Sequence, residues 1–265
     1  MTLPFGSDAL RAIAEQAAAL AKTGFSRADT IERKADGSPV TATDREVDAF
    51  LRDALRRLHP GAGWLSEETA DDPARLARED VWIVDPIDGT AQLVRGIPEL
   101  AVSIGLVRNG APVAAAVVNP ATGEGGVWIE GTPPAFIGLE THPAPRSLAD
   151  ARATVSRTEH EAGDLIGLES FAGITRPVGS VAYKLLRVAA GADDLTYSIR
   201  PKREWDVCGG VALVTAAGRA YLRLDGRSLV FNSRDGIVAS GAVAGPLALA
   251  AALRDRLLKA GRWGG

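Results

Sequence analysis

The first sixty residues place apolar side chains at helical spacing in two stretches. Residues 8–23 alternate alanine and larger apolar side chains with charged ones, which predicts a helix. After a turn signal at 36–39, Thr41 or Thr43 can cap a second helix, in which apolar positions from Val47 to Leu58 follow the i, i+3, i+4, i+7 pattern. His59-Pro60-Gly61 ends it. We therefore expect two amphipathic helices that share a core.

The next part of the chain has the pattern of strands. Apolar runs are predicted as strands at 64–66, 81–85, 100–107, 112–119 and 126–129, with a short helix at 73–78. The Asn109-Gly110 step between two of these runs is a strong hairpin signal. These runs predict a largely antiparallel sheet.

A proline- and threonine-rich stretch at 131–150 separates this sheet from a different pattern. Strand-like runs at 153–156 and 194–199 alternate with helix-like segments at 180–190 and 206–217, followed by a final helix around 244–260. Such alternation is typical of an α/β layer. We therefore expect two halves, residues 1–145 and 146–265, in one α/β (α+β) protein.

The composition of the chain argues against some classes of function and partner. A formal charge of −3 argues against a nucleic-acid polymer as partner, since domains that bind one are usually basic. A lone cysteine, Cys208, excludes an internal disulfide and suits a reducing compartment. Neither a signal peptide nor an apolar run long enough to span a bilayer is evident. We expect a soluble, cytoplasmic protein with no membrane partner.

The most informative segment is Asp85-Pro86-Ile87-Asp88-Gly89-Thr90, which ends the strand predicted at 81–85. Pro86 fixes its own φ and disfavours helix at the residue before it. A rigid turn can therefore direct both carboxylates and the Ile87 carbonyl toward one place. Carboxylate oxygens are the ligands that Mg²⁺ prefers, with substrate oxygens completing its shell. The segment predicts a site for a divalent cation and a phosphate.

Three further acidic positions lie far apart in the sequence: Asp44, the Glu67-Glu68 pair and Asp206. Taken singly, Asp44 and Asp206 are explained by compensation of a helix dipole. A Glu-Glu pair is usually a solvated surface feature. Only their combination with the 85–90 segment indicates a function.

In this order the motifs resemble the inositol monophosphatase superfamily of Mg²⁺-dependent, lithium-sensitive phosphatases. The resemblance runs from Lys34 to about Gly218. It implies a layered α/β/α/β/α sandwich of the inositol monophosphatase and fructose-1,6-bisphosphatase type, with a metal site between the halves, and a homodimer. It rests on the segments Ser38–Asp44, Ser66-Glu67-Glu68, Trp82–Thr90, Ala101–Gly105, Gly179-Ser180 and Trp205-Asp206.

The resemblance also implies roles for individual residues. Two or three Mg²⁺ ions are expected, the first held by Glu67, Asp85 and the Ile87 carbonyl and the second by Asp85, Asp88 and Asp206. Glu68 would act near the first ion. Asp44 would accept a hydrogen bond from Thr90 and support a weaker third ion, while Thr90 and Glu67 orient the attacking water. The implied substrate-binding residues are Asp88, Gly89, Thr90, Gly179, Ser180, Arg200, Lys202 and Asp206.

The substrate is less well defined than the chemistry. Segment 96–106 resembles the inositol monophosphatase branch, whereas segment 200–206 resembles the 3′(2′),5′-bisphosphate nucleotidase branch. The glutamate that contacts inositol hydroxyls in the first branch is not evident, since Ser198 or Ile199 occupies its place. Arg200, Lys202 and Arg203 could bind a second phosphate or could simply offset nearby acids.

We expect a phosphomonoesterase that hydrolyses a small phosphorylated metabolite with metal-activated water, with inositol monophosphate favoured as the substrate. Hydrolysis of 3′-phosphoadenosine 5′-phosphate is the alternative. Action on a sugar bisphosphate, or a non-catalytic binding role, is more distant.

Overall fold

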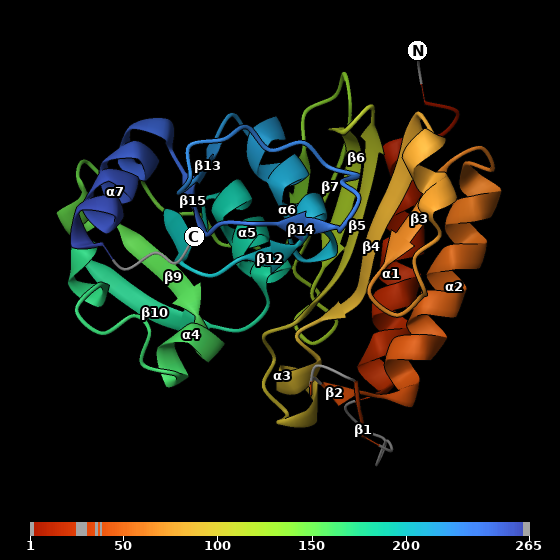
Figure 1. Cartoon of the computed structure of the whole chain (residues 1–265), viewed down its shortest axis with the longest axis horizontal. Coiled ribbons are helices and arrows are strands. Elements are labelled where there is room, and N and C mark those ends of the chain that lie inside the picture. Colours follow the sequence, from red (N-terminus) through yellow and green to blue (C-terminus); the bar gives the residue numbers. More distant parts are fainter. Residues whose placement is uncertain (1–2, 25–30, 35–36, 38, 262–265) are drawn as a thin grey trace.

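Five layers make up the protein, in the order helices, sheet, helices, sheet, helix (Figure 1). The computed structural model describes residues 3–24, 31–34, 37 and 39–261. The predicted α/β/α/β/α sandwich is confirmed. The predicted turn at 36–39 includes Asp36 and Ser38, which lie outside the described residues.

The first sheet has six strands in the order β3-β4-β5-β6-β7-β8. β3 runs parallel to β4, and every other neighbouring pair is antiparallel. Asn109 and Gly110 both have positive φ, 51° and 80°, which is the geometry expected of a tight hairpin turn. The strands are β3 (Gly63–Ser66), β4 (Asp80–Asp88), β5 (Ala101–Arg108), β6 (Ala111–Val118), β7 (Gly125–Ile129) and β8 (Ala135–Ile137).

Two helices, α1 (Ser7–Thr23) and α2 (Ala42–Leu58), cover the outer face of this sheet. Their apolar faces meet alternate side chains of the strands, including Trp82 and Ile104, in one buried cluster. Thr41 is the N-cap of α2 and Asp44 completes a capping box. The helix therefore begins within the range that the sequence predicted.

The opposite face of the sheet packs on the middle layer, α5 (Val181–Ala190) and α6 (Glu204–Ala216). A side chain at Gly209 would lie 2.7 Å from Ser103 Oγ of β5, and one at Gly210 would lie 2.5 Å from Leu185 Cβ of α5. These glycines let α6 approach both neighbours closely. The first turn of α6 is thereby held over the carboxyl end of β4.

The second sheet has the order β10-β9-β11-β15-β13, with α7 (Leu247–Ala260) on its outer face. Its strands are β9 (Arg152–Ser156), β10 (Ile174–Val178), β11 (Leu195–Ser198), β13 (Ala220–Arg223) and β15 (Ala242–Gly245). The final helix was expected from about residue 244. That start is wrong, because residues 242–245 pair with β11 and β13 and the helix begins only after Pro246.

Several short elements were not predicted: β8, β10, β13, and α4 (Arg157–Glu161). The alternating burial of β10 and the half-buried residues of β13 leave no long apolar run to detect. Two small ribbons, β1 (Glu32–Arg33) with β2 (Pro39–Val40) and β12 (Lys202–Arg203) with β14 (Ile237–Val238), complete the strands.

The remaining helical elements are short: α3 (Thr90–Val94) and the 3₁₀ turns η1 (Pro73–Ala77), η2 (Leu148–Asp150) and η3 (Glu169–Phe171). In the part of the chain that the structure describes, no helix has the length and apolar character needed to cross a membrane.

Candidate active site

The carboxyl end of β4 carries the acidic turn that the sequence singled out. Asp85 is 1% exposed, and its Oδ1 accepts a hydrogen bond from the Ile87 N–H at 3.0 Å. Its Oδ2 has no hydrogen-bond partner among the described residues. A buried carboxylate oxygen without a donor is costly, so it calls for a ligand.

Two further carboxylates reach the same place from other elements. Glu67 follows β3, whose parallel pairing with β4 brings the ends of both strands to one edge of the sheet. Asp206 lies in the first turn of α6 and accepts the Arg203 N–H at 2.9 Å. Ligand oxygens of Glu67, Asp85 and Asp206 all lie within 4.8 Å of one another. Such an arrangement could hold a divalent cation.

The electrostatics of this cluster favour the binding of a cation. Burial, together with the charges of Glu67, Asp88 and Asp206, raises the pKa of Asp85 well above its usual value. Burial and the charge of Asp88 raise the pKa of Asp206 to about 8. Burial also raises the pKa of Glu67, although Lys34 opposes the shift. A bound cation would remove the repulsion that keeps these groups protonated.

The predicted hydrogen bond between Thr90 and Asp44 is present. Thr90 Oγ1 donates to Asp44 Oδ1 at 2.7 Å and also lies 3.1 Å from the Ile87 carbonyl oxygen. The other oxygen of Asp44 accepts the Thr41 N–H at 2.8 Å. Asp44 is thus fixed by the cap of α2, and it fixes the threonine of the acidic turn.

Asp88 is not one of the three grouped carboxylates, because α5 engages one of its oxygens. Its Oδ2 accepts the Ser180 hydroxyl at 2.7 Å and the Ala182 N–H at 2.6 Å. Ser180 caps α5 and has a positive φ of 56°, so this turn is a sterically costly one. The Gly179-Ser180 motif therefore positions an acidic side chain 92 residues away.

Lys34 was missed by the sequence reasoning. Its Nζ donates to Glu67 Oε1 at 2.7 Å and to Glu68 Oε1 at 2.6 Å. Burial would lower the pKa of this lysine, but the two carboxylates outweigh burial and raise it. The ammonium group partly compensates the acidic cluster. No local pattern could have revealed the contact, which spans 33 residues.

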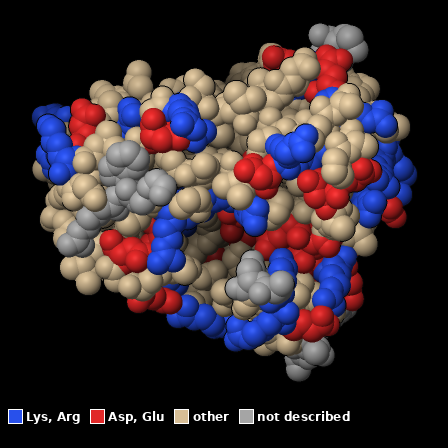
Figure 2. Space-filling model, viewed as in Figure 1, with Lys and Arg blue, Asp and Glu red and all other residues tan. Residues whose placement is uncertain are grey.

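A cavity of about 270 Å³ lies beside Asp88 and Gly89. The face of the molecule in Figure 2 has a hollow near its middle with acidic side chains along one side. Other lining residues are Gln92, Glu159, Gly179, Ser180, Lys184, Arg200 and Lys202.

The basic residues at the far side of the cavity are paired with acids. Lys202 Nζ donates to Glu159 Oε1 at 2.7 Å, and Arg200 pairs with Asp164. Glu159 is 1% exposed and also accepts the Ser198 hydroxyl and the Ile199 N–H. A glutamate from α4 thus reaches the place where the sequence shows only Ser198 and Ile199.

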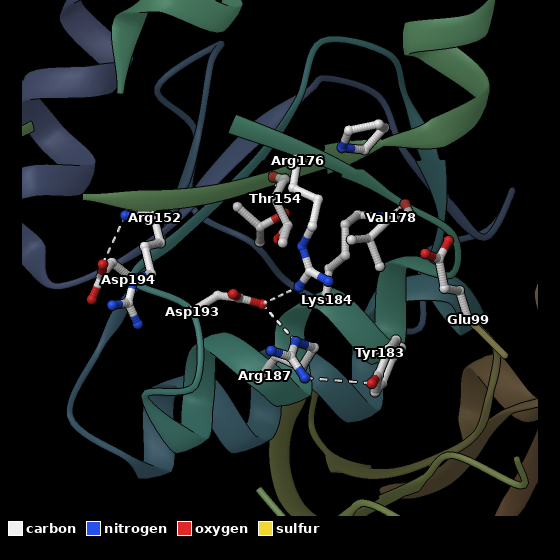
Figure 3. Close-up of polar contacts among 12 residues, drawn as sticks. Glu99, Arg152, Thr154, Arg176, Val178, Tyr183, Lys184, Arg187, Asp193 and Asp194 are labelled. Atoms are coloured by element: carbon white, nitrogen blue, oxygen red, sulfur yellow. Dashed lines mark hydrogen bonds and ion pairs between the residues drawn. The ribbon is translucent and has the colours of Figure 1, made fainter. Parts of the chain in front are cut away.

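One lining residue of this cavity is a buried lysine, Lys184, which Figure 3 shows beside Val178. Lys184 is 2% exposed, and its Nζ donates to the carbonyls of Val178 at 3.1 Å and Ser180 at 2.9 Å. Burial lowers the pKa of Lys184 to about 8 despite the nearby charge of Asp88. Glu99 accepts the Gly179 N–H at 2.7 Å. Together these contacts hold the turn that contacts Asp88.

The protein has a five-layered α/β fold with a buried acidic cluster that could hold a divalent cation, next to a polar cavity lined by Asp88. Comparison with known proteins agrees. The family model "Inositol monophosphatase family" matches residues 7–257. An inositol monophosphatase 2 from Solanum lycopersicum is 31% identical over 234 residues, covering 83% of this chain and 88% of the relative.

A 3′(2′),5′-bisphosphate nucleotidase CysQ from Escherichia coli is 30% identical over 218 residues, covering 78% of this chain and 85% of the relative. Among solved structures, an IMPase from Thermotoga maritima superposes with a TM-score of 0.78 at 23% identity, covering 95% of this chain and 98% of the other. The chain belongs to the inositol monophosphatase family, whose members hydrolyse phosphate monoesters.

Proposed function

We propose that the protein is a Mg²⁺-dependent phosphomonoesterase that attacks its substrate with a metal-activated water. The observation that carries the proposal is the group of Glu67, Asp85 and Asp206, within which one oxygen of Asp85 has no partner. Mg²⁺ bound there would lower the pKa of a coordinated water and neutralise charge on the phosphoryl group. Oxygen-only ligands suit this hard cation.

In this proposal each residue has a defined task. Glu67, Asp85 and the Ile87 carbonyl hold the first ion, and Asp85, Asp88 and Asp206 hold the second. Thr90, fixed by Asp44, accepts a hydrogen bond from the attacking water, which Glu67 also orients. Because Thr90 donates its one hydroxyl proton to Asp44, its oxygen faces the water as an acceptor.

The phosphate is expected at the start of α3. Gly89 has a φ of 106°, which places it in a conformation that favours glycine, and a Cβ there would lie 3.1 Å from the Glu99 carbonyl oxygen. The first N–H groups of a helix have no carbonyl of a preceding turn to bond. Those of Gly89 and Thr90 are therefore available to phosphate oxygens beside Asp88.

Inositol monophosphate is the substrate that the cavity favours. Lys202 and Arg200 are each paired with a carboxylate, so the cavity wall has little net charge to offer a second phosphate. Lys202, whose charge is neutralised by Glu159, presents donors at the cavity wall, which suits hydroxyl groups. Support also comes from relatives named as inositol monophosphatases.

A bisphosphate nucleotide is the second candidate. The cavity extends from Asp88 as far as Arg200 and Lys202, which gives room for a group beyond the scissile phosphate. A nucleotide phosphate there would have to compete with Glu159 and Asp164 for the two cations. Relatives named as bisphosphate nucleotidases support this candidate at similar identity.

The test is phosphate release with Mg²⁺ from inositol 1-phosphate and 3′-phosphoadenosine 5′-phosphate in parallel, with and without Li⁺. We expect faster release from inositol 1-phosphate and inhibition by tens of millimolar Li⁺. Preference for the nucleotide would reverse the substrate assignment. No release from either substrate, with Mg²⁺ binding shown by calorimetry, would contradict the proposed activity while leaving the metal site in place.

Three further features belong to this proposal: a boundary between halves near residue 145, a homodimer and a cytoplasmic location. The boundary is supported by the two sheets, because the first draws its strands from residues 63–137 and the second from residues 152–245. Light scattering of the purified protein measures the oligomeric state, and a monomer would contradict that part.

A further inference from the structure

A second polar cavity, of about 150 Å³, is lined by residues of α2, β3 and the segment 69–78 that contains η1. Four arginines line it, and three of them have no acidic partner: Arg52 and Arg56 on α2, and Arg78 just after η1. Arg52 and Arg56 are four residues apart and so lie on the same face of the helix. We call this cavity, with the side chains that line it, the arginine cavity.

The guanidinium groups of these three arginines are uncompensated. Across the part of the chain that the structure describes, none has an ion pair or a side-chain hydrogen bond, and the buried Nε of Arg52 has no acceptor. Arg52 is half-buried, whereas Arg56 and Arg78 are exposed. Gathering like charges in one hollow raises the local potential for an anion.

The framework of the arginine cavity is rigid. A fourth arginine, Arg75, is 2% exposed and makes a bidentate pair with Asp71 at 2.6 and 2.9 Å. A Cβ at Gly63 would lie 3.2 Å from Arg78 Cγ, so the absence of a side chain there makes room for Arg78. The one acidic lining residue is Asp72, whose Oδ1 is engaged by the Ala74 N–H at 2.9 Å.

Trp64 forms part of the wall of this hollow, and its indole N–H is buried within that wall. The residue is 8% exposed, and its indole N–H has no partner in the described residues. A buried donor without a partner costs free energy unless a ligand or water satisfies it. Guanidinium groups and an indole N–H donate hydrogen bonds and accept none, so the ligand has to offer several hydrogen-bond acceptor atoms.

We propose that the arginine cavity binds a phosphate group, either as free orthophosphate or as part of a small phosphate ester. Phosphate presents several acceptor oxygens in the geometry that guanidinium groups bind best. The site is distinct from the acidic cluster, since none of its lining residues is a carboxylate of that cluster. It does not depend on the proposed phosphatase activity.

Titration calorimetry of the whole chain at low ionic strength in EDTA tests the proposal, because without metal the acidic cluster repels phosphate. Orthophosphate and glycerol 3-phosphate are titrated separately. Binding of orthophosphate alone assigns the site to the free ion, and binding of both assigns it to a phosphate group in general. Absence of binding to wild type for both at about 10 mM, which corresponds to a negligible affinity, would overturn the proposal.

Neighbouring residues on α2 provide a matched control. Both Arg56 and Arg57 are exposed, but only Arg56 lines the cavity, so Arg56→Gln and Arg57→Gln remove the same charge from inside and outside the site. We expect Arg56→Gln to weaken phosphate binding at least about tenfold, the loss of one charge-assisted hydrogen bond, and Arg57→Gln to leave it within about twofold. Equal loss in both variants would show nonspecific attraction and contradict a built site.

A spectroscopic readout locates the ligand independently. Phosphate should shift the indole N–H resonance of Trp64, assigned with Trp64→Phe, and leave that of Trp82 unchanged. Trp82 is a suitable reference because it is fully buried, also lacks an indole acceptor among the described residues and does not line the cavity. Binding that leaves the Trp64 resonance unmoved would place the phosphate elsewhere.

Discussion

The two sides of the active site are built in different ways. On the acidic side, the end of β4 and the residues just after it supply Asp85, Asp88 and Thr90, while Asp44, Glu67 and Asp206 come from elsewhere. The cavity wall draws on segments 88–92, 156–159, 178–184 and 200–202, which belong to different elements. A local turn creates the acidic side, whereas tertiary packing creates the wall.

The two sides also differ in charge compensation. On the acidic side, Lys34 is the one cation paired with Glu67 among the described residues, and the pKa values of Asp85 and Asp206 are raised by burial and mutual repulsion. On the wall, Lys202 and hydrogen bonds outweigh burial and lower the pKa of Glu159. The acidic side is therefore suited to a metal ion, whereas the wall is already neutralised.

The prediction with the largest expected effect is a substitution on the acidic side of the site. Asp85→Asn removes the charge that both proposed ions share, so kcat/KM should fall at least about a hundredfold on every substrate. The same change should raise the melting temperature of the metal-free protein, because it relieves repulsion within the cluster. Asp53→Asn, on the exposed face of α2, is the control and should alter neither. Retained activity in Asp85→Asn would remove Asp85 from the ligand set.

This contrast explains what the sequence could predict. Two amphipathic helices, the Asn109-Gly110 hairpin and the acidic turn are set by spacings of a few residues, and the structure confirms them. The start of α7 was wrong because a short apolar strand and a helical stretch look alike without their neighbours.

Long-range pairs were beyond the sequence for the same reason. Lys34 beside Glu67 and Glu159 beneath Ser198 are each contacts between segments more than thirty residues apart. The sequence also gives no sign that these side chains are buried, since a Lys or Glu in a polar stretch is normally exposed. The predicted roles of Arg200 and Lys202 stay predictions, because both residues line the cavity but already have acidic partners.

An intermediate effect is expected when pH is varied. The pKa of Asp206 is raised to about 8 in the folded protein from a usual 3.8. A raised pKa gives stability that is present in acid and is lost as pH rises through the folded value. The free energy of unfolding in EDTA should therefore fall from about pH 5 to about pH 8, whereas the stabilisation by Mg²⁺ should grow over that range.

Urea unfolding at several pH values, with EDTA or with Mg²⁺, measures both trends. Asp85→Asn provides the comparison, because loss of one carboxylate should flatten the EDTA curve. A metal-free protein that becomes more stable between pH 5 and pH 8 would contradict the assignment of strained, protonated carboxylates to this cluster.

The smallest expected effect concerns the wall. Lys202→Gln removes the ammonium group that pairs with Glu159. Arg203→Gln is the control, because Arg203 does not line the cavity and its guanidinium lies over the ring of Trp205, 5.5 Å from the ring centroid. If the wall binds hydroxyl groups, Lys202→Gln should lower kcat/KM for inositol 1-phosphate by about three- to tenfold through KM, with kcat retained. Arg203→Gln should leave the value within about twofold. A selective loss on the bisphosphate nucleotide would instead show that Lys202 leaves Glu159 to bind a second phosphate, and the two sides of the site would then both recognise charge.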